Sequence, residues 1–181
     1  MRHPSEIPGV CLIAHPTRDD ARGGFTKLMH PDDLGLPHGG SFPLRESFVS
    51  WSEPGVLRGM HFQSPPFAHD KAVTCLSGRV LDVVLDLRRS SPTFGRATSF
   101  MLDGAAPATV FIPAGCAHGF AVIGAERALM HYSVTAEHSP ANDAGVRWDS
   151  FGFTWPAGAA VMVSARDQAL PAFDELPAVF P

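Results

Sequence analysis

Apolar and polar residues alternate along the middle of the chain in the way that is typical of β-strands. In the segment 79–87, RVLDVVLDL, one face of an extended chain is wholly apolar, with Leu81, Val83, Leu85 and Leu87. The other face carries carboxylates between valines: Val80, Asp82, Val84 and Asp86. A strand with one apolar and one half-polar face suits a barrel or sandwich whose polar side meets a cavity or water.

Further strands are predicted around this segment. The runs AVTCL, TVFIP, GFAVIG and RALMHYSVT read as strands, and Ser77-Gly78 predicts a tight turn. Residues 1–50 are mixed, with one short helical turn expected at Asp32–Gly35. The segment ARDQAL predicts a short helix that Pro171 ends. We therefore expect an all-β jelly roll or barrel with a few short peripheral helices, enclosing a small-molecule cavity.

Composition narrows the classes of function. A chain of 181 residues is expected to form one domain, residues 1–181. Its 17 glycines and 17 prolines argue against a helical bundle and suit short strands joined by turns. Fourteen basic residues against 18 acidic ones give a net charge of −4, which disfavours a general nucleic-acid binder.

We expect the protein to be located in the cytoplasm and not to bind a membrane. No stretch approaches the roughly 18 apolar residues of a membrane helix. The N-terminal segment, MRHPSEIPGVCLIAHP, has a proline at position 4 and no long apolar core, so no signal peptide is expected. The cysteines, Cys11, Cys75 and Cys116, are odd in number and have no paired spacing, which indicates reduced thiols.

Residues that are able to carry chemistry gather in four segments. The densest is RGMHFQ with the following HDK, which places Arg58, His61, His69 and Lys71 within 14 residues. The others are residues 113–120 with His118, the pair His131-Tyr132, and the run Ser164-Ala165-Arg166-Asp167. Their coexistence in an all-β chain with a cavity favours a functional site over isolated surface residues.

Two classes of site compete for these residues. A metal site would use His61, His69 and His118, since cupin-type barrels hold a divalent ion with histidines and a carboxylate. The spacing disfavours it, because no strand carries a close histidine pair. The alternative is acid–base chemistry, with a histidine base, the single tyrosine Tyr132 as acid, and cations for an anionic substrate. We therefore expect no metal.

Four segments, in this order, make the chain similar to a known family: RGMHFQ, HDKAVTCLSGRVLDVVLDLRRSSPTFG, FIPAGCAHGF and VRWDSFGFTWP. They resemble the nucleotide-sugar 4-keto-6-deoxyhexose epimerases, whose archetype is dTDP-4-dehydrorhamnose 3,5-epimerase. The resemblance extends over roughly residues 20–172. It implies a metal-independent cupin jelly roll, typically a homodimer, that acts on a nucleotide-diphosphate sugar without a cofactor.

The resemblance also implies a role for each member of the acid–base set. His61 matches the family's general base, and Asp167 of the Ser-x-x-Asp element matches the carboxylate that orients this base. Lys71 matches the cation beside the developing enolate, and Tyr132 matches the acid. The implied reaction removes a proton next to the C4 ketone and returns one from the opposite face, which inverts C3, C5 or both carbons.

Substrate contacts are implied in the same way. Arg58 and Arg22, the second within an Asp-x-Arg-Gly element, match arginines that hold the diphosphate, for which a forked guanidinium is well suited. His118 matches a histidine of the cavity wall, and Gln63 belongs to the RGMHFQ motif. His138 completes the expected binding set.

The departures from the family pattern lie among the nucleotide contacts. His138 stands where the family has an aromatic residue that stacks on the thymine base. Glu46-Ser47-Phe48 replaces a Gln-x-Asn element, and Ser133 replaces a lysine. The nucleotide is therefore open between dTDP and another such as CDP, and the enzyme between a two-centre and a single-centre epimerase.

Other interpretations of these residues stay open at this stage. Asp167 alternatively caps the terminal helix, Arg22 alternatively lies on the surface, and Asp82 is expected to pair with a cavity histidine or lysine. For the whole protein, the alternatives are a metal-dependent cupin enzyme and a non-catalytic module that binds a sugar nucleotide.

Overall fold

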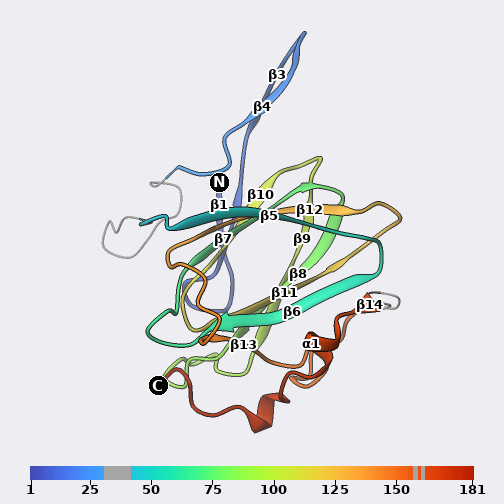
Figure 1. Cartoon of the computed structure of the whole chain (residues 1–181). Coiled ribbons are helices and arrows are strands. Elements are labelled where there is room, and N and C mark those ends of the chain that lie inside the picture. The colour runs from blue at the N-terminus through green and yellow to red at the C-terminus, as the bar shows by residue number, and fades with distance from the viewer. Residues whose placement is uncertain (31–41, 157–158, 160–161) are drawn as a thin grey trace.

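The computed structural model describes residues 1–30, 42–156, 159 and 162–181, and most of its strands belong to two facing sheets (Figure 1). The first sheet has six antiparallel strands in the order β1-β2-β10-β7-β12-β5. Their bounds are Arg2–Pro4 (β1), Cys11–Ala14 (β2), Ala108–Ile112 (β10), Lys71–Ser77 (β7), Ala128–Val134 (β12) and Glu46–Ser52 (β5). Strand β5 therefore forms one edge of this sheet.

The second sheet follows the order β13-β6-β11-β8-β9, and β14 pairs in parallel with β6. The bounds are Asp143–Gly145 (β13), Val56–Gln63 (β6), Cys116–Val122 (β11), Arg79–Asp86 (β8), Ala97–Asp103 (β9) and Met162–Val163 (β14). Two further strands, Thr17–Asp20 (β3) and Gly23–Thr26 (β4), pair with each other and with none of the other described strands. Figure 1 shows that this hairpin projects from the body of the molecule.

The sequence-based prediction of an all-β fold is confirmed. Each run predicted as a strand between residues 72 and 135 overlaps one of the strands β7, β8, β10, β11 and β12 and extends beyond it by at most two residues at either end. The described helices are short: α1 is Ala165–Gln168, as the ARDQAL segment predicted, and a 3₁₀ turn covers Phe173–Glu175. The short turn expected at Asp32–Gly35 lies outside the described residues.

The turn between β7 and β8 is the one predicted at Ser77-Gly78. Gly78 has a φ of +75°, a left-handed conformation that residues with a side chain rarely adopt. A Cβ at this position would also lie 2.5 Å from the carbonyl oxygen of Arg127. Glycine is thus required here by both conformation and space, and the tight turn places β8 directly after β7.

Both faces of β8 are buried, each in a different apolar cluster. Val80 and Val84 pack between the two sheets, whereas Val83 and Leu85 pack beneath the second sheet with Phe180 near the C-terminus. The C-terminal segment therefore covers the outer face of the second sheet (Figure 1). The predicted difference between the two faces of β8 holds, since the inner one carries the fully buried Asp82 toward the cavity described below.

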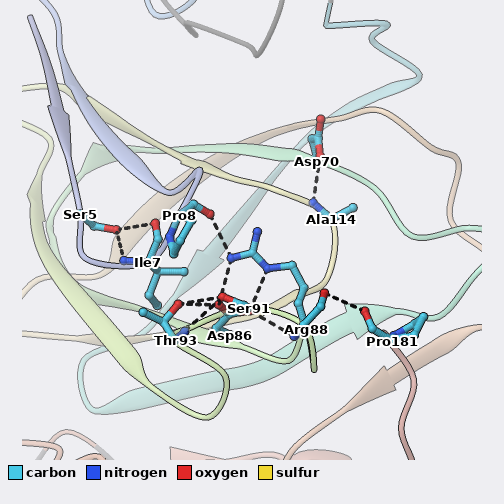
Figure 2. A network of polar contacts seen from close by, with 11 residues as sticks. Ser5, Ile7, Pro8, Asp70, Asp86, Arg88, Ser91, Thr93, Ala114 and Pro181 are labelled. Carbon is cyan, nitrogen blue, oxygen red and sulfur yellow. Dashed lines mark hydrogen bonds and ion pairs between the residues drawn. The ribbon is translucent and has the colours of Figure 1, made fainter.

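A buried carboxylate anchors the loop that follows β8. Figure 2 shows Asp86 accepting hydrogen bonds from Arg88, Ser91 and Thr93, at 2.8 and 2.9 Å, 2.6 Å and 2.7 Å respectively. Burial alone would raise the pKa of Asp86, but these donors hold it below its usual value. Arg88 also donates to the carbonyl oxygen of Pro8 at 2.9 Å, so the same cluster fixes the N-terminal loop.

A second contact in Figure 2 connects β7 with β11. The carboxylate of Asp70, directly before β7, accepts the main-chain N–H of Ala114 at 2.8 Å, in the turn that leads into β11. This contact holds the start of β7, which carries Lys71, close to the start of β11, which carries His118.

The cysteines and the helices agree with the expectations from the sequence. All three cysteines are free and buried, as the sequence indicated, and burial raises the pKa of the Cys116 thiol to about 12. Within the described part of the chain, no helix has the length and apolar character needed to cross a bilayer.

Candidate active site

A cavity of about 530 Å³ lies between the inner faces of the two sheets. Strands β5, β6, β7, β11 and β12 line it, together with the loop after β12, β13 and helix α1. Its polar lining includes Arg58, His61, Lys71, His118, Tyr132 and Arg166. Five of these six residues belong to the candidate set that the sequence defined.

One pair in the cavity wall has the geometry of an oriented base. The Nε2 atom of His61, on β6, lies 2.7 Å from Oδ1 of Asp167, on α1, although 106 residues separate them in sequence. Asp167 is buried, while His61 keeps 28% of its side chain exposed, toward the cavity that it lines. A carboxylate bound to one ring nitrogen fixes the tautomer and leaves the other nitrogen, Nδ1, as the basic atom.

The carboxylate of Asp167 is itself held from two sides. Its Oδ2 accepts the main-chain N–H of Gly59 at 3.1 Å, and its own N–H donates to Ser164 Oγ at 3.1 Å. Ser164 is thus the residue that caps α1, and the alternative role of Asp167 as the cap is wrong. Burial alone would raise the pKa of Asp167, but the hydrogen bonds from His61 and Gly59 bring it below its usual value. The carboxylate is therefore ionised at neutral pH.

Gly59 makes the approach of β6 to β11 and α1 possible. Its φ is +127°, and a Cβ there would lie 2.5 Å from the Cα atom of Gly119 on β11. A side chain at position 59 would push the two strands apart and move the N–H that Asp167 accepts. The RG of the RGMHFQ motif thus serves the geometry of the base pair.

Lys71 supplies a cation to the same cavity. Its Nζ donates to the main-chain carbonyl oxygen of His61 at 3.2 Å. Burial lowers the pKa of Lys71 to about 8, and the carboxylates of Asp143 and Asp82 limit the decrease. The ammonium is therefore charged at neutral pH but holds its proton less firmly than a solvated lysine does.

Tyr132 enters the cavity from the opposite sheet. It lies on β12 of the first sheet, whereas His61 lies on β6 of the second. Burial raises the pKa of the Tyr132 phenol above its usual value, and the nearby Ser50 hydroxyl and Arg58 guanidinium only partly oppose this. The phenol consequently stays protonated at neutral pH, which is the state that a proton donor requires.

A second histidine–carboxylate pair lies deeper in the cavity. His118 Nε2 is 2.7 Å from Oδ2 of Asp82, and His118 is 5% exposed while Asp82 is fully buried. The predicted pairing of Asp82 with a cavity histidine is confirmed. Oδ1 of Asp82 has no hydrogen-bond partner among the described residues. The ring of His118 lies edge-on to Tyr132, with 6.2 Å between ring centroids.

Arg58 lies where the cavity meets the edge strand β5. Its Nε donates to Ser52 Oγ at 2.8 Å and its Nη2 to the carbonyl oxygen of Trp51 at 3.2 Å. These contacts hold the guanidinium in one direction, and the residue remains exposed to a ligand. A fixed, exposed guanidinium is suited to a phosphate group.

The three histidines considered for a metal site do not converge. His61 and His118 each bind their own aspartate, and His69 Nδ1 lies 3.1 Å from both the Gln63 carboxamide and the carbonyl oxygen of Phe67. Across the described ranges, no group of three histidine, cysteine or acidic side chains is arranged to hold a metal ion.

Comparison with known proteins agrees with this geometry. The chain matches the family model described as dTDP-4-dehydrorhamnose 3,5-epimerase over residues 4–175. The chain belongs to this family. It is thus an epimerase, a class of isomerase, of nucleotide-linked 4-keto-6-deoxyhexoses with the cupin fold.

Three relatives illustrate the range of the epimerase family. The dTDP-4-dehydrorhamnose 3,5-epimerase of Sinorhizobium fredii is 40% identical, over 96% of this chain and 90% of its own length. The dTDP-4-dehydrorhamnose 3-epimerase of Streptomyces niveus is 36% identical, over 91% of this chain and 80% of its own. The structure of a Legionella pneumophila 3,5-epimerase in complex with dTDP-4-keto-L-rhamnose superimposes with a TM-score of 0.92 at 29% identity, covering 100% and 97% of the two chains.

Two residues expected to bind substrate in this epimerase have other contacts in the structure. Gln63 is buried; its carboxamide donates to the carbonyl oxygens of Phe67 and Glu137 and accepts the N–H of Ser139 at 2.6 Å. Its side chain therefore braces two loops at the cavity wall. The main-chain N–H of His138 donates to Oε1 of Glu46 at 3.1 Å, which leaves its exposed ring at the cavity rim.

Arg22 is the one expected site residue that lies away from the cavity. It sits at the turn of the β3–β4 hairpin, with 89% of its side chain exposed, and pairs with Asp20 at 2.6 Å. It is absent from the described lining of the cavity. Within one copy of the chain, it therefore behaves as the surface arginine that was the alternative interpretation.

Sequence reasoning assigned no role to one pair of charged residues at the cavity. Arg166 Nη2 donates to Asp143 Oδ2 at 2.7 Å, and Arg166 Nη1 lies 3.5 Å from Nε2 of His61. The position of Arg166 beside Asp167 on a predicted helix was the only signal in the sequence. Asp143 gave none, because its place depends on the pairing of β13 with β6.

Proposed function

We propose that residues 1–181 form one epimerase domain that inverts C3, C5 or both carbons of a nucleotide-linked 4-keto-6-deoxyhexose by proton transfer through an enolate. The observation that carries this proposal is the arrangement of base and acid. His61, held by Asp167 of α1, and the buried phenol of Tyr132 line one cavity from two facing sheets.

His61 acts as the general base in this mechanism. Since Nε2 is bound to Asp167, the Nδ1 atom removes the proton from the carbon next to the C4 ketone. The electron pair of the broken C–H bond moves into the ring, and the C4 oxygen becomes an enolate oxygen. The ionised Asp167 stabilises the imidazolium that forms.

Lys71 and Tyr132 complete the reaction. The Lys71 ammonium stabilises the negative charge on the C4 oxygen, because a cation in a partly dehydrated cavity interacts strongly with developing charge. Tyr132 then gives its proton to the same carbon from the opposite face, which inverts the centre. Solvent afterwards returns a proton to the phenolate and removes one from His61.

The substrate is a nucleoside-diphosphate sugar, with Arg58 as a ligand of the diphosphate and His118 beside the sugar. dTDP is the first nucleotide to test, since the relatives reported above act on or bind dTDP sugars. A CDP-linked sugar and inversion of a single centre are the alternatives. Relatives of both the 3,5- and the 3-epimerase types are similar to this chain, so the number of inverted carbons has to be measured.

We also propose that two copies of the chain form a homodimer. The outer face of the edge strand β5 exposes Val49 and Trp51, by 50% and 61%. The β3–β4 hairpin extends away from the body, so its Arg22 would reach a diphosphate only in another copy (Figure 1). Sedimentation equilibrium tests this proposal: a dimer is expected, and Trp51→Glu should shift it to monomer. A wild-type monomer at micromolar concentration contradicts it.

Deuterium uptake tests the proposed reaction. The protein is incubated with dTDP-4-keto-6-deoxyglucose in D₂O, and deuterons are counted by mass spectrometry and located by NMR. Uptake at C3 and C5 identifies a two-centre epimerase, and uptake at one carbon a single-centre enzyme. His61→Ala should abolish uptake, whereas His131→Ala, whose ring binds Ser47, should not. Absence of uptake by the wild type with both dTDP- and CDP-linked substrates contradicts the proposal.

A further inference from the structure

An aromatic ring on the edge strand lies open to the cavity. Strand β5 places Glu46, Phe48 and Ser50 on its inner face, and all three line the cavity. Phe48 is directly opposite Tyr132 in the antiparallel register, and their rings stack with 4.9 Å between centroids and 16° between planes. One face of the Phe48 ring is thus covered by the proposed acid.

The other face of this ring has no aromatic partner among the described residues. Phe48 is 46% exposed, whereas Tyr132 beneath it is 9% exposed. Because β5 is an edge strand, no further strand of the described sheet covers the ring. A half-exposed aromatic ring at a cavity is a surface on which a planar ring can stack, since offset stacking is the preferred geometry of two flat rings.

The charges around the ring indicate which kind of planar group fits. Arg58, Lys71 and Arg166 give the cavity three cationic side chains. Arg58 contacts Ser52, four residues along β5 from Phe48, which corresponds to about 13 Å of extended strand. A ligand that binds both places needs an anionic group at one end and a flat ring at the other. A nucleoside diphosphate has both and is of this length.

We propose that Phe48 is the stacking surface for the nucleobase of the substrate. This inference rests on the proposed function, which supplies a nucleotide-linked ligand, and adds the residue that holds the base. The base lies on the open face of Phe48, so that base, Phe48 and Tyr132 form one stack at the edge of the first sheet. The exposed ring of His138, at the rim, is then not needed for stacking.

The arrangement has a consequence for catalysis. A bound base would cover the open side of β5 and exclude water from the stack above Tyr132. The contribution of Phe48 should therefore appear in nucleotide affinity and in KM, while kcat changes little, because Phe48 contacts the base and not the reacting carbon. A purely structural role, in which Phe48 only positions Tyr132, would instead lower kcat.

The test compares ligands with and without a base. Phe48→Leu keeps an apolar side chain but removes the flat ring, and Phe48→Trp restores one. Calorimetric titration with dTDP should give a Kd about 5- to 150-fold higher for Phe48→Leu, the range found for single base–aromatic stacks. Inorganic pyrophosphate, which has no base, should bind the variant and the wild type equally. Phe94→Leu, in an aromatic pair with Phe173 away from the cavity, is the matched control.

Each outcome decides between the alternatives. Equal dTDP affinity of wild type and Phe48→Leu, or equal losses for dTDP and pyrophosphate, overturns the stacking role. So does wild-type protein that binds none of dTDP, UDP and CDP. Loss of dimer in Phe48→Leu with unchanged dTDP affinity would identify a second copy as the group that covers the ring. Failure of the proposed function is separate, since it appears as absent deuterium uptake by the wild type.

Discussion

Replacing Asp167 with asparagine isolates the electrostatic part of the base pair, because the two side chains have nearly the same shape. The carboxylate of Asp167 accepts two hydrogen bonds, from His61 at 2.7 Å and from the Gly59 N–H at 3.1 Å. An asparagine has one acceptor oxygen and one NH₂ group. It can therefore satisfy only one of the two donors, and its NH₂ group must face the other.

Both orientations of the asparagine are unfavourable. If its oxygen faces His61, the buried N–H of Gly59 loses its acceptor, which costs about 1–3 kcal/mol of stability. If its oxygen faces Gly59, the NH₂ group donates to Nε2 of His61, and the ring proton moves to Nδ1. His61 then has no free base on the cavity side. The contribution of a positioned base, about 10²–10⁴-fold, is lost, which corresponds to about 2.7–5.4 kcal/mol in the barrier.

The assay measures the initial rate of deuterium uptake by the substrate, together with the Tm of each variant. Asp167→Asn should lose at least about 100-fold in rate while it remains folded at 25 °C. Asp149→Asn is the control, because Asp149 forms an exposed ion pair with Arg147 and should lose neither rate nor stability. A rate for Asp167→Asn within about threefold of the wild type would refute the assignment of Asp167 as the partner of the base.

Two further predictions follow from the charged groups. Lysine is charged below its pKa, so with a pKa of about 8 the Lys71 ammonium is lost as the pH rises, and kcat/KM for exchange should fall above about pH 8. Lys71→Arg should retain the charge and move this decrease to higher pH; an unchanged decrease contradicts the role of Lys71. Arg88→Met removes a partner of the buried Asp86 and should cost about 3 kcal/mol, lowering Tm by about 6–12 °C. Arg79→Met, whose pair with Asp103 is exposed, should cost less than about 1 kcal/mol, and equal losses would contradict the anchoring role of Arg88.

Strands could be predicted from the sequence where apolar and polar residues alternate because one face is buried. Where burial does not produce this alternation, the strand was not predicted. Strand β8 has a regular pattern because its outer face packs in an apolar cluster, while its inner face places the buried Asp82 and Asp86 between valines. Strand β5, ESFVSWS, has none: its inner face lines the cavity with Glu46 and Ser50, and its outer face exposes Val49 and Trp51. An edge strand at a binding site is under no requirement for apolar alternation, so the period of two that marks a half-buried strand is absent.

The site residues also fall into two groups, those that the sequence identified and those whose contacts depend on the tertiary structure. His61 and Lys71 lie in recognisable motifs, Tyr132 is the single tyrosine of the chain, and the structure brings the three together around one cavity. The contact between Arg166 and Asp143 could not be inferred, because it spans 23 residues and depends on how β13 pairs with β6. Gln63 was identified as a site residue, but its loop-bracing contacts require the positions of segments that follow β12.

The two parts of the site differ in how firmly the fold constrains them. Apart from Asp167 on α1, the residues of the proposed chemistry lie on strands paired on both sides: β6, β7, β11 and β12. A substitution there disturbs buried neighbours, as the contact between Gly59 and Gly119 illustrates. The proposed base contact, Phe48, lies on an edge strand whose outer side has no partner in the described sheet. Since exposed positions usually tolerate exchange within about 0.5 kcal/mol, nucleotide contacts are able to diverge while the acid–base set is retained. This fold therefore loses the least stability when residues that contact the nucleotide change and the residues of the acid–base chemistry stay the same.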